Sequence, residues 1–380
     1  MSTGKRHAAG ARLPSGRRLA RAALALLAGA AAMAAAAAAL AAAADAAAPS
    51  AAMASMRADD ARVLRMGRTV AAGDGALRFG YPGVTLTVEF EGTRLAADLA
   101  GGAGSLLDVR VDGGTPFTLR PGTRRRSVAL VEHAAPGRHR VELLHRTETW
   151  LGVVTVARFA TDGRFHAPPP LPARSMLVLG DSVTCGADME RGPGDKNDPS
   201  WWNAGASYGM LLGHALGARV QLVCHGGRGL LRSWNGNTDE YQLPAFYELA
   251  IADAAAPAPW QQADDRADLI LVAIGTNDFN QGIPEREAWV GAYAAFVRRL
   301  LRDHPQAQVA LTEGAILDGE KKAALTAYLR ETVERVADAR VHAIPSLHHP
   351  GDAQDAHPTT PQHAAMAREL APHLRRLAGW

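Results

Sequence analysis

The sequence predicts two structural classes in succession: an all-β sandwich of jelly-roll type, then an α/β domain built on a parallel sheet. Between residues 63 and 159, short β-branched or alternating runs are punctuated by Gly, Pro and Asp, and no long amphipathic helix interrupts them. After a proline-rich segment, apolar runs alternate with stretches of helical periodicity. The first pattern is typical of sandwiches, and the second is typical of parallel sheets covered by helices on both faces.

Residues 1–50 are predicted to be a targeting segment outside the fold. A cationic region ends at Arg21, and a mostly alanine run without charge extends from residue 22 to residue 44, followed by small residues that suit a cleavage site. The run is long enough to span a bilayer, so the sequence leaves open a cleaved signal peptide or a retained membrane anchor. In both cases we expect the body of the protein to be secreted or periplasmic.

The charge distribution argues against a nucleic-acid partner. The first fifty residues hold six of the 41 Lys and Arg residues but one of the 38 acidic residues, so the remainder has a net charge of −2. No basic stripe with interleaved aromatic residues appears. No cofactor is expected either, because "GGRGLL" lacks the spacing of a dinucleotide-binding motif. The oligomeric state is not predicted.

The β-sandwich domain is predicted over residues 56–165. Its strands are expected at "VTLTVEF", "LLDVRVD", "FTLR", "SVALV", "HRVELLH" and "LGVVTVARF". The four prolines of "ATDGRFHAPPPLPAR" exclude a helix or a central strand there. Residues 166–173 are therefore expected to form a linker.

The α/β domain is predicted over residues 174–380. Its strands are expected at "SMLVLG", "ARVQLVCHG", "DLILVAIG", "QVALTEG" and "RVHAIP", with long helical patterns between and after them. In such sheets ligands bind beyond the carboxyl ends of the strands. Three strands run into "GDS", "CHGGRG" and "GTND", and "DAQDAHP" follows near the C-terminus. We expect these segments to meet at one edge of the sheet.

Together, the polar residues at these strand ends point to acyl transfer. Ser182, the glycines after the second strand, Asn277 and His357 comprise a nucleophile, oxyanion donors and a general base. Each segment alone is weak evidence, since turns use the same residues. Their order along the chain is the informative feature.

In that order, Ser182, a glycine of "GGRG", Asn277 and His357 resemble the SGNH (GDSL-type) hydrolases. "GDSVTCG", "GGRGLLR" and "LVAIGTNDF", preceded by "VDGG" and "LLHRTE" in the β-rich region, resemble carbohydrate esterase family 2. Members of that family pair a jelly-roll domain with an SGNH domain and remove acetyl groups from plant-type polysaccharides. The resemblance implies a carboxylic ester hydrolase that acts on acetylated carbohydrate, such as acetylxylan or glucomannan, through an acyl-enzyme.

The resemblance also implies the roles of the site residues. Ser182 would be the nucleophile and His357 the general base, while the backbone N–H groups of Ser182 and Gly227 and the side-chain amide of Asn277 would form the oxyanion hole. Gly226 and Gly229 remain alternatives for the glycine.

The acid of the expected triad departs from the superfamily pattern. That pattern places an aspartate three residues before the histidine, where this chain has Gln354, whereas Asp355 lies two residues before His357. In an extended segment residues i and i−2 point the same way, so Asp355 would reach the imidazole; a turn would favour Gln354 or a backbone carbonyl. Asp355 is the predicted third member, and the alternatives stay open. Asp181 and Asp278 are expected to bond turn amides.

Three tryptophans and two cysteines lie close to these motifs. Trp201, Trp202 and Trp234 are predicted to stack on sugar rings, with core packing as the alternative. Cys185 and Cys224 are the two cysteines of the chain, and the sequence leaves open one disulfide or two buried thiols.

No metal site is predicted. The histidines outside the motifs lack metal-ligand spacing with an acid or a cysteine; they include His225, His348, His349 and His363.

Other functions compete with polysaccharide deacetylation. The same Ser–His site would serve a cell-envelope glycan O-acetyl esterase or an acetyltransferase, and transfer differs from hydrolysis in whether a sugar or water reaches the acyl-enzyme. A short-chain carboxylesterase or lipase is a further alternative, although no long apolar lid is evident. A carbohydrate-binding module with an inactive site is disfavoured because all four motif residues are present.

Overall fold

A computed structural model describes residues 53–192 and 198–380. The targeting segment predicted for residues 1–50 lies outside the described residues. Residues 53–380 form one compact unit. Within the described part, no helix combines the length and the apolar character that crossing a membrane requires.

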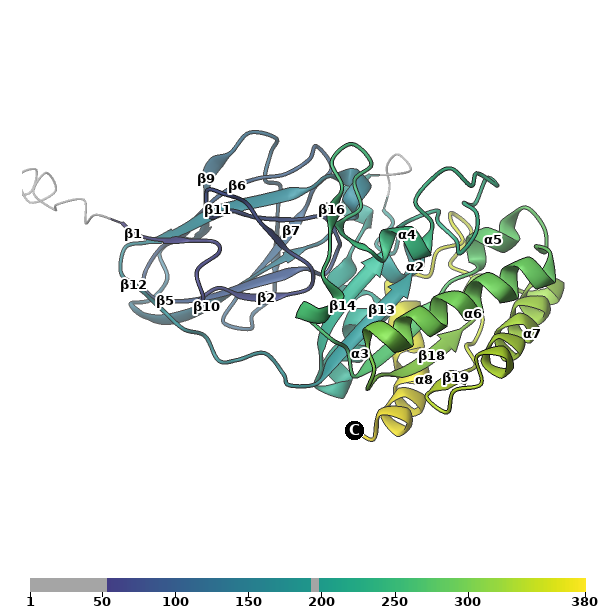
Figure 1. Ribbon diagram of the computed structural model, residues 1–380. Helices are drawn as coiled ribbons and strands as arrows, with labels where there is room; N and C mark the ends of the chain where they lie inside the picture. The colour runs from purple at the N-terminus through teal and green to yellow at the C-terminus, as the bar shows by residue number, and fades with distance from the viewer. Residues whose placement is uncertain (1–52, 193–197) are drawn as a thin grey trace, which may run out of the picture. The chain divides into compact units, whose positions relative to one another are not determined.

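The first part of this unit contains two antiparallel sheets. One has the strand order β3-β4-β11-β6-β9, with β1 paired to β11, and the other has the order β12-β5-β10-β7-β8, with β2 paired to β5 (Figure 1). The strands of the first sheet are β1 (Ala54–Arg57), β3 (Val70–Ala71), β4 (Leu77–Phe79), β6 (Leu95–Ala100), β9 (Arg126–Val131) and β11 (Val154–Thr161). Those of the second are β2 (Leu64–Met66), β5 (Thr85–Gly92), β7 (Leu107–Val111), β8 (Phe117–Leu119), β10 (Gly137–His145) and β12 (Arg164–His166).

Alternating burial along these strands explains why the two sheets pack as a sandwich. On β6, buried residues alternate strictly with half-buried ones, and the last five residues of β10 show the same period of two. Phe79, Phe90 and Phe159, contributed by both sheets, are buried in one hydrophobic core. The β-sandwich predicted from the short alternating runs is confirmed.

The second part is built on a parallel sheet with the strand order β14-β13-β17-β18-β19. The strands are β13 (Ser175–Gly180), β14 (Arg219–Cys224), β17 (Leu269–Ala273), β18 (Gln308–Thr312) and β19 (Val341–Ala343). All four pairings are parallel. Every residue of β13 and β17 is buried, as expected for strands covered on both faces. This confirms the predicted α/β fold class.

Long helices cover both faces of the parallel sheet: α3 (Tyr208–Leu216), α6 (Arg286–Asp303), α7 (Gly319–Val336) and α8 (Thr360–Ala378). Val178 packs with residues of α3 and α8, whereas Leu177 and Leu179 pack with residues of α6 and α7. Because alternate strand residues face opposite sides of a sheet, the two helix pairs lie on opposite faces. Figure 1 shows α6 and α7 side by side.

The remaining elements are short. They are the helices α2 (Ser182–Cys185), α4 (Leu243–Phe246) and α5 (Thr276–Asn280), the 3₁₀ turns η1 (Thr149–Leu151), η2 (Pro199–Trp201), η3 (Ala204–Ala206) and η4 (Gln262–Asp264), and the small hairpin β15 (Leu249–Ile251) with β16 (Ala258–Pro259). Two of the short helices, α2 and α5, directly follow β13 and β17 and therefore lie at the carboxyl edge of the sheet.

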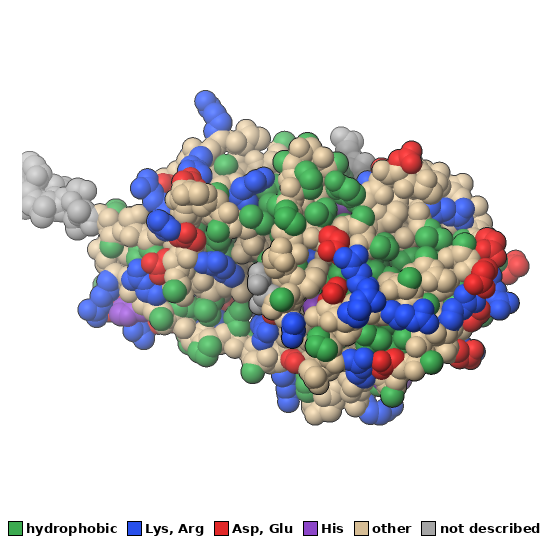
Figure 2. Space-filling view, viewed as in Figure 1, with side chains coloured by type: hydrophobic (Ala, Val, Ile, Leu, Met, Phe, Trp, Pro, Cys, Tyr) green, Lys and Arg blue, Asp and Glu red, His purple; other side chains and the backbone are tan. Residues whose placement is uncertain are grey.

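The outer faces of α6 and α7 are joined by ion pairs. Arg286 binds Glu331 at 2.7 Å and Arg335 binds Glu287 at 2.5 Å. Figure 2 shows acidic and basic side chains interspersed on this part of the surface. Exposed pairs of this kind contribute little to stability.

Polar contacts that the sequence did not reveal join the β-sandwich to the parallel-sheet region. Arg68, which is buried, donates to the carbonyl oxygens of Tyr247 at 2.6 Å and Leu249 at 2.8 Å. The hydroxyl of Tyr81 donates to the carbonyl oxygen of Phe246 at 2.6 Å. Buried donors of this kind must be satisfied by fixed acceptors, so these bonds join the β-sandwich to the segment around α4. The predicted limits at residues 166 and 173 stay a prediction.

Candidate active site

The first strand-end segment places Ser182 at the start of α2. Asp181 caps this helix, because its Oδ1 accepts the N–H of Val183 at 3.1 Å, and Gly186 ends it in the left-handed conformation with φ 73°. A side chain at position 180 would meet Thr184 Oγ1 at 2.0 Å, so the turn requires glycine there. The motif "GDSVTCG" thus describes a strand, a cap and one helical turn that present the serine at the sheet edge.

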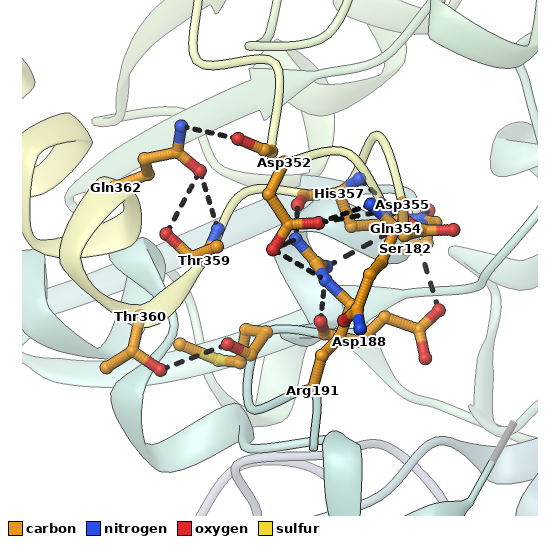
Figure 3. A network of polar contacts seen from close by, with 12 residues as sticks. Ser182, Asp188, Arg191, Asp352, Gln354, Asp355, His357, Thr359, Thr360 and Gln362 are labelled. Carbon is orange, nitrogen blue, oxygen red and sulfur yellow. Dashed lines mark hydrogen bonds and ion pairs between the residues drawn. The ribbon is translucent and has the colours of Figure 1, made fainter. Parts of the chain in front are cut away.

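Ser182, His357 and Asp355 form a continuous hydrogen-bonded chain. The Ser182 Oγ lies 2.8 Å from Nε2 of His357, and the Nδ1 of that imidazole lies 2.5 Å from Oδ1 of Asp355. Oδ1 of Asp355 also accepts the backbone N–H of His357 at 2.8 Å. Figure 3 shows the three side chains converging from α2 and from the loop before α8.

Asp355 is the acid hydrogen-bonded to the imidazole, and Asp188 Oδ2 lies 3.7 Å from the same nitrogen. Gln354 is exposed, and its backbone N–H donates to Asp352 Oδ1 at 2.9 Å. No contact of its side chain with His357 occurs among the described residues. Asp355 approaches through a turn rather than an extended strand, because its carboxylate binds both the backbone and the ring of His357.

The loop that carries His357 is held by Arg191, which the sequence analysis missed. The guanidinium donates to the carbonyl oxygen of His357 at 3.0 Å and to Asp352 Oδ2 at 3.2 Å. It also donates to the carbonyl oxygen of Asp188 at 2.5 Å. Figure 3 shows Arg191 between these groups. Asp352 and His357 lie more than a hundred residues further along the chain, so no local pattern reveals these contacts.

The carboxylates around His357 favour its protonated form. Burial lowers the pKa of His357, but the hydrogen bond and charge of Asp355 and the charges of Asp188 and Asp181 outweigh burial, and the pKa is raised overall. The hydrogen bond from His357 lowers the pKa of Asp355 to about 2. Asp355 is therefore ionised at neutral pH and is able to stabilise a proton on the imidazole.

The glycines after β14 differ in what their N–H groups bind. The N–H of Gly226 donates to Glu148 Oε2 at 2.6 Å, and that of Gly229 donates to Gln242 Oε1 at 3.0 Å. Gly227 adopts the left-handed region with φ 73°, and its N–H donates to no residue that the structure describes. Gly227 alone of the three thus has a backbone donor available to a ligand.

Asn277 and Asp278, on α5, bind the loop that follows β14. One N–H of the Asn277 amide donates to the carbonyl oxygen of Arg228 at 2.8 Å, which leaves its second hydrogen for another acceptor. The buried Asp278 carboxylate accepts the N–H groups of Leu230 at 2.7 Å and Leu231 at 2.8 Å. Asp278 therefore bonds turn amides, as expected.

Burial separates the three tryptophans that the sequence grouped together. Trp201 and Trp202 are 7% and 3% exposed and pack with Ala187, so they offer no open ring face to a sugar, and core packing describes them better. Trp234 is 55% exposed, and its backbone N–H donates to the carbonyl oxygen of Gly227 at 2.9 Å. Trp150, which the sequence analysis did not select, is 51% exposed and stands edge-on to Trp202.

Cys185 and Cys224 form a disulfide, which decides between the two alternatives that the sequence left open. Cys185 ends the helix that begins with Ser182, and Cys224 ends β14. Both side chains are buried. The bond therefore ties the nucleophile turn to the strand from which the glycine loop departs.

Replacing both cysteines with alanine should lower the free energy of unfolding by about 4 kcal/mol, because the bond constrains a loop of some forty residues in the unfolded chain. The two cysteines are separated by 39 positions. Urea unfolding of the wild type and the double variant measures the difference, with the wild type in dithiothreitol as a control. Equal midpoints for the oxidised wild type and the variant would contradict this expectation.

Asp188, Asp355 and His357 are the one group of potential metal ligands whose atoms lie within 4.8 Å of one another in the described part of the chain. Nδ1 of His357 is already hydrogen-bonded to Asp355.

His363, on α8, is buried, and its Nδ1 accepts the backbone N–H of Tyr208 at 3.2 Å.

Comparisons with known proteins identify the relatives of the chain. Residues 65–170 match the carbohydrate esterase 2 N-terminal family, and residues 178–375 match the GDSL-like lipase/acylhydrolase family. The chain is 48% identical over 328 residues to an acetylxylan esterase / glucomannan deacetylase of Cellvibrio japonicus, which covers 86% of this chain and 92% of that protein.

Solved structures give the same result. A family two carbohydrate esterase from Cellvibrio japonicus superposes with a TM-score of 0.85 at 47% identity, covering 87% of this chain and 99% of that one. A carbohydrate esterase family 2 enzyme of Corynascus thermopiles (Myceliophthora fergusii) superposes with a TM-score of 0.74 at 26% identity, covering 84% of this chain and 100% of that one. With a sandwich and a parallel-sheet region that both match, and near-half identity along most of its length, the chain belongs to carbohydrate esterase family 2.

Proposed function

We propose that the chain hydrolyses O-acetyl esters of plant-type polysaccharides, of the acetylxylan or glucomannan kind, through a covalent acetyl-serine. The observation that carries the proposal is the hydrogen-bonded chain from Ser182 through His357 to Asp355. The 48% identity to an acetylxylan esterase / glucomannan deacetylase supports the choice of substrate.

The first half of the reaction follows from the orientation of the imidazole. The Nδ1–H of His357 donates to Asp355, so Nε2 is the nitrogen that accepts the proton of Ser182. The Ser182 Oγ attacks the acetyl carbonyl carbon, and the carbonyl oxygen becomes an oxyanion. When the tetrahedral intermediate collapses, the bond to the sugar oxygen breaks, and His357 returns the proton to that oxygen. The sugar leaves with a free hydroxyl.

Water completes the cycle by the same route. His357 removes a proton from water, the hydroxide attacks acetyl-Ser182, and acetate leaves as the serine recovers its proton. The N–H groups of Ser182 and Gly227 and the Asn277 amide would stabilise both oxyanions. Removal of one such donor in other enzymes costs about 10²- to 10³-fold in kcat. A sugar hydroxyl in place of water would make the reaction a transfer.

The exposed indoles supply a surface for the carbohydrate. A side chain at position 227 would meet Trp234 Cδ1 at 2.9 Å, so this indole adjoins the proposed oxyanion loop. The side chains of Trp234 and Trp150 are both about half exposed. Flat apolar faces of this kind suit the C–H faces of sugars. We infer that Trp234 and Trp150 bind the glycan, in place of the buried Trp201 and Trp202.

We also infer that residues 1–50 direct export, either as a signal peptide that is cleaved or as a membrane anchor that is retained. The Cys185–Cys224 disulfide supports this, because such bonds persist in oxidising compartments.

Acetate release tests the substrate. The kcat/KM should be at least about tenfold higher on acetylated xylan or glucomannan than on O-acetylated bacterial envelope glycans, and higher on 4-nitrophenyl acetate than on the octanoate. Faster cleavage of the octanoyl ester would favour a lipase. Acetylated sugar products with little free acetate would favour transfer.

A further inference from the structure

Glu148 is a buried carboxylate to which the mechanism gives no role. It follows β10 in "LLHRTETW", and it is 1% exposed. Burial raises the pKa of Glu148, and N–H donors oppose this effect. A carboxylate kept in such a place needs partners for both oxygens.

Three N–H groups supply those partners. Oε2 accepts the backbone N–H of Gly226 at 2.6 Å and the indole N–H of Trp150 at 3.1 Å. Oε1 accepts the indole N–H of Trp202 at 3.1 Å. Glu148 and Trp150 belong to the segment after β10, whereas Gly226 and Trp202 belong to loops of the parallel-sheet region. One side chain of the sandwich therefore binds the loop beside the proposed oxyanion donor.

The contact with Gly226 is close enough to exclude a side chain there. A Cβ at position 226 would lie 2.9 Å from Oε2 and 3.0 Å from Oε1 of Glu148. Gly226 is not among the residues with positive φ, so its backbone conformation does not require glycine. A side chain at this position would therefore require the Glu148 carboxylate to shift.

The neighbouring bonds fix the peptide that carries the Gly227 N–H. The carbonyl oxygen of Gly226, in the same peptide plane, lies 3.1 Å from Nδ1 of His225. Burial lowers the pKa of His225 to about 4, so the neutral ring donates this proton at pH 7. The Gly227 carbonyl accepts the backbone N–H of Trp234 at 2.9 Å. Glu148 binds the preceding peptide by accepting the backbone N–H of Gly226.

We propose that Glu148 is a positioning residue through which the β-sandwich sets the oxyanion hole of the parallel-sheet region. The proposal rests on the oxyanion role proposed for Gly227. Glu148 makes no hydrogen bond to Ser182 or His357 among the described residues, although its charge interacts with that of His357. Its hydrogen-bonded connection to the site runs through Gly226. The catalytic region would need the sandwich for transition-state stabilisation, not solely for binding the glycan.

Glu148→Gln tests the proposal. Glutamine keeps the size of the side chain but turns one acceptor oxygen into a donor. An NH₂ group in place of Oε2 removes the acceptor of Gly226 and Trp150, and one in place of Oε1 removes that of Trp202. In both orientations the bond to Gly226 is either lost or deprived of its charge. We expect kcat on 4-nitrophenyl acetate to fall by about 30- to 100-fold, with KM changed by less than about twofold, because a misplaced oxyanion donor costs somewhat less than a removed one. Affinity for methylboronic acid, which forms a tetrahedral adduct with a nucleophilic serine, should fall in parallel.

Asp108→Asn is the matched control. Asp108 is a buried carboxylate of the same sandwich that binds Arg146 at 3.0 Å and Thr118 at 2.8 Å, away from the glycine loop. Its kcat should stay within about twofold of wild type. A folded Glu148→Gln enzyme within about threefold of wild type, or an equal loss in Asp108→Asn, would overturn the proposal.

Gly226→Ala disrupts the same contact by changing its other partner. This variant keeps the test decisive if Glu148→Gln does not fold. It should lower kcat to a similar degree, and the double variant should lose little more than either single variant. Losses that multiply would mean that the two residues act independently, which contradicts the proposal. Esterase activity retained by Ser182→Ala would instead refute the proposed function, so the two failures are distinguishable.

Discussion

Ser182→Ala should lower kcat on 4-nitrophenyl acetate by about 10⁶-fold, the loss measured when a comparable nucleophile is removed from a serine hydrolase. The reason is that no other hydroxyl among the described residues bonds to Nε2 of His357. Within residues 53–192 and 198–380, the Ser182 side chain bonds to that nitrogen alone, so the variant should keep the unfolding midpoint of the wild type.

Two measurements complete this experiment. Calorimetry checks that Ser182→Ala is folded, and Ser127→Ala on β9, an exposed serine of the sandwich, serves as the matched control. A folded Ser182→Ala enzyme with more than about a hundredth of wild-type kcat would show that the acyl-serine mechanism is wrong.

Asp355→Ala should lower kcat by about 10⁴-fold, as when the triad aspartate of a serine protease is replaced. Without the carboxylate at 2.5 Å, the imidazole loses the acceptor that holds its tautomer. The pH profile should change as well. In the wild type, kcat/KM rises with pH as His357 loses its proton, at a pH above the ordinary histidine pKa, because the carboxylates raise its pKa. Removing Asp355 takes away the two largest influences that raise this pKa, so this limb should move to lower pH.

Gln354→Ala is the matched control for this experiment, because Gln354 is exposed and adjacent. We expect its kcat/KM to stay within about twofold of wild type and its pH profile to be unchanged. A larger loss for Gln354→Ala than for Asp355→Ala, or an unshifted limb in Asp355→Ala, would show that another group orients the imidazole.

The sequence predicted the fold class and the neighbouring positions of Ser182 and His357 because both depend on patterns with a short period. Alternation along β6 and unbroken burial along β13 are read directly from the residues. Parallel strands bring their carboxyl ends to one edge, so the motifs had to meet. The choice of family depended on resemblance in "GDSVTCG" and "LVAIGTNDF", and similarity along most of the chain confirmed it.

Contacts between distant segments could not be predicted in this way. Arg191 binds a loop 166 positions away, and Glu148 binds Gly226 across 78 positions. Neither has a periodic or motif-like neighbourhood. The sequence could not decide whether Trp201 and Trp202 are buried for a related reason. Their loop is rich in Gly, Pro and Asn, and the acceptor that permits the burial of Trp202 is the distant Glu148.

The buried bonds of Arg68 and Tyr81 limit how this protein can be rearranged in evolution or in the laboratory. A gene fusion that moved residues 174–380 alone would leave the carbonyl oxygen of Phe246 without its Tyr81 donor, and the carbonyl oxygen of Tyr247 would keep Gln262 but lose Arg68. Each such orphaned group costs about 1 to 3 kcal/mol if it stays buried. The sandwich and the parallel-sheet region should therefore be kept together as one unit, both in evolution and in engineered fusions. Chimaeric proteins should be joined before residue 53 rather than at the proline-rich segment.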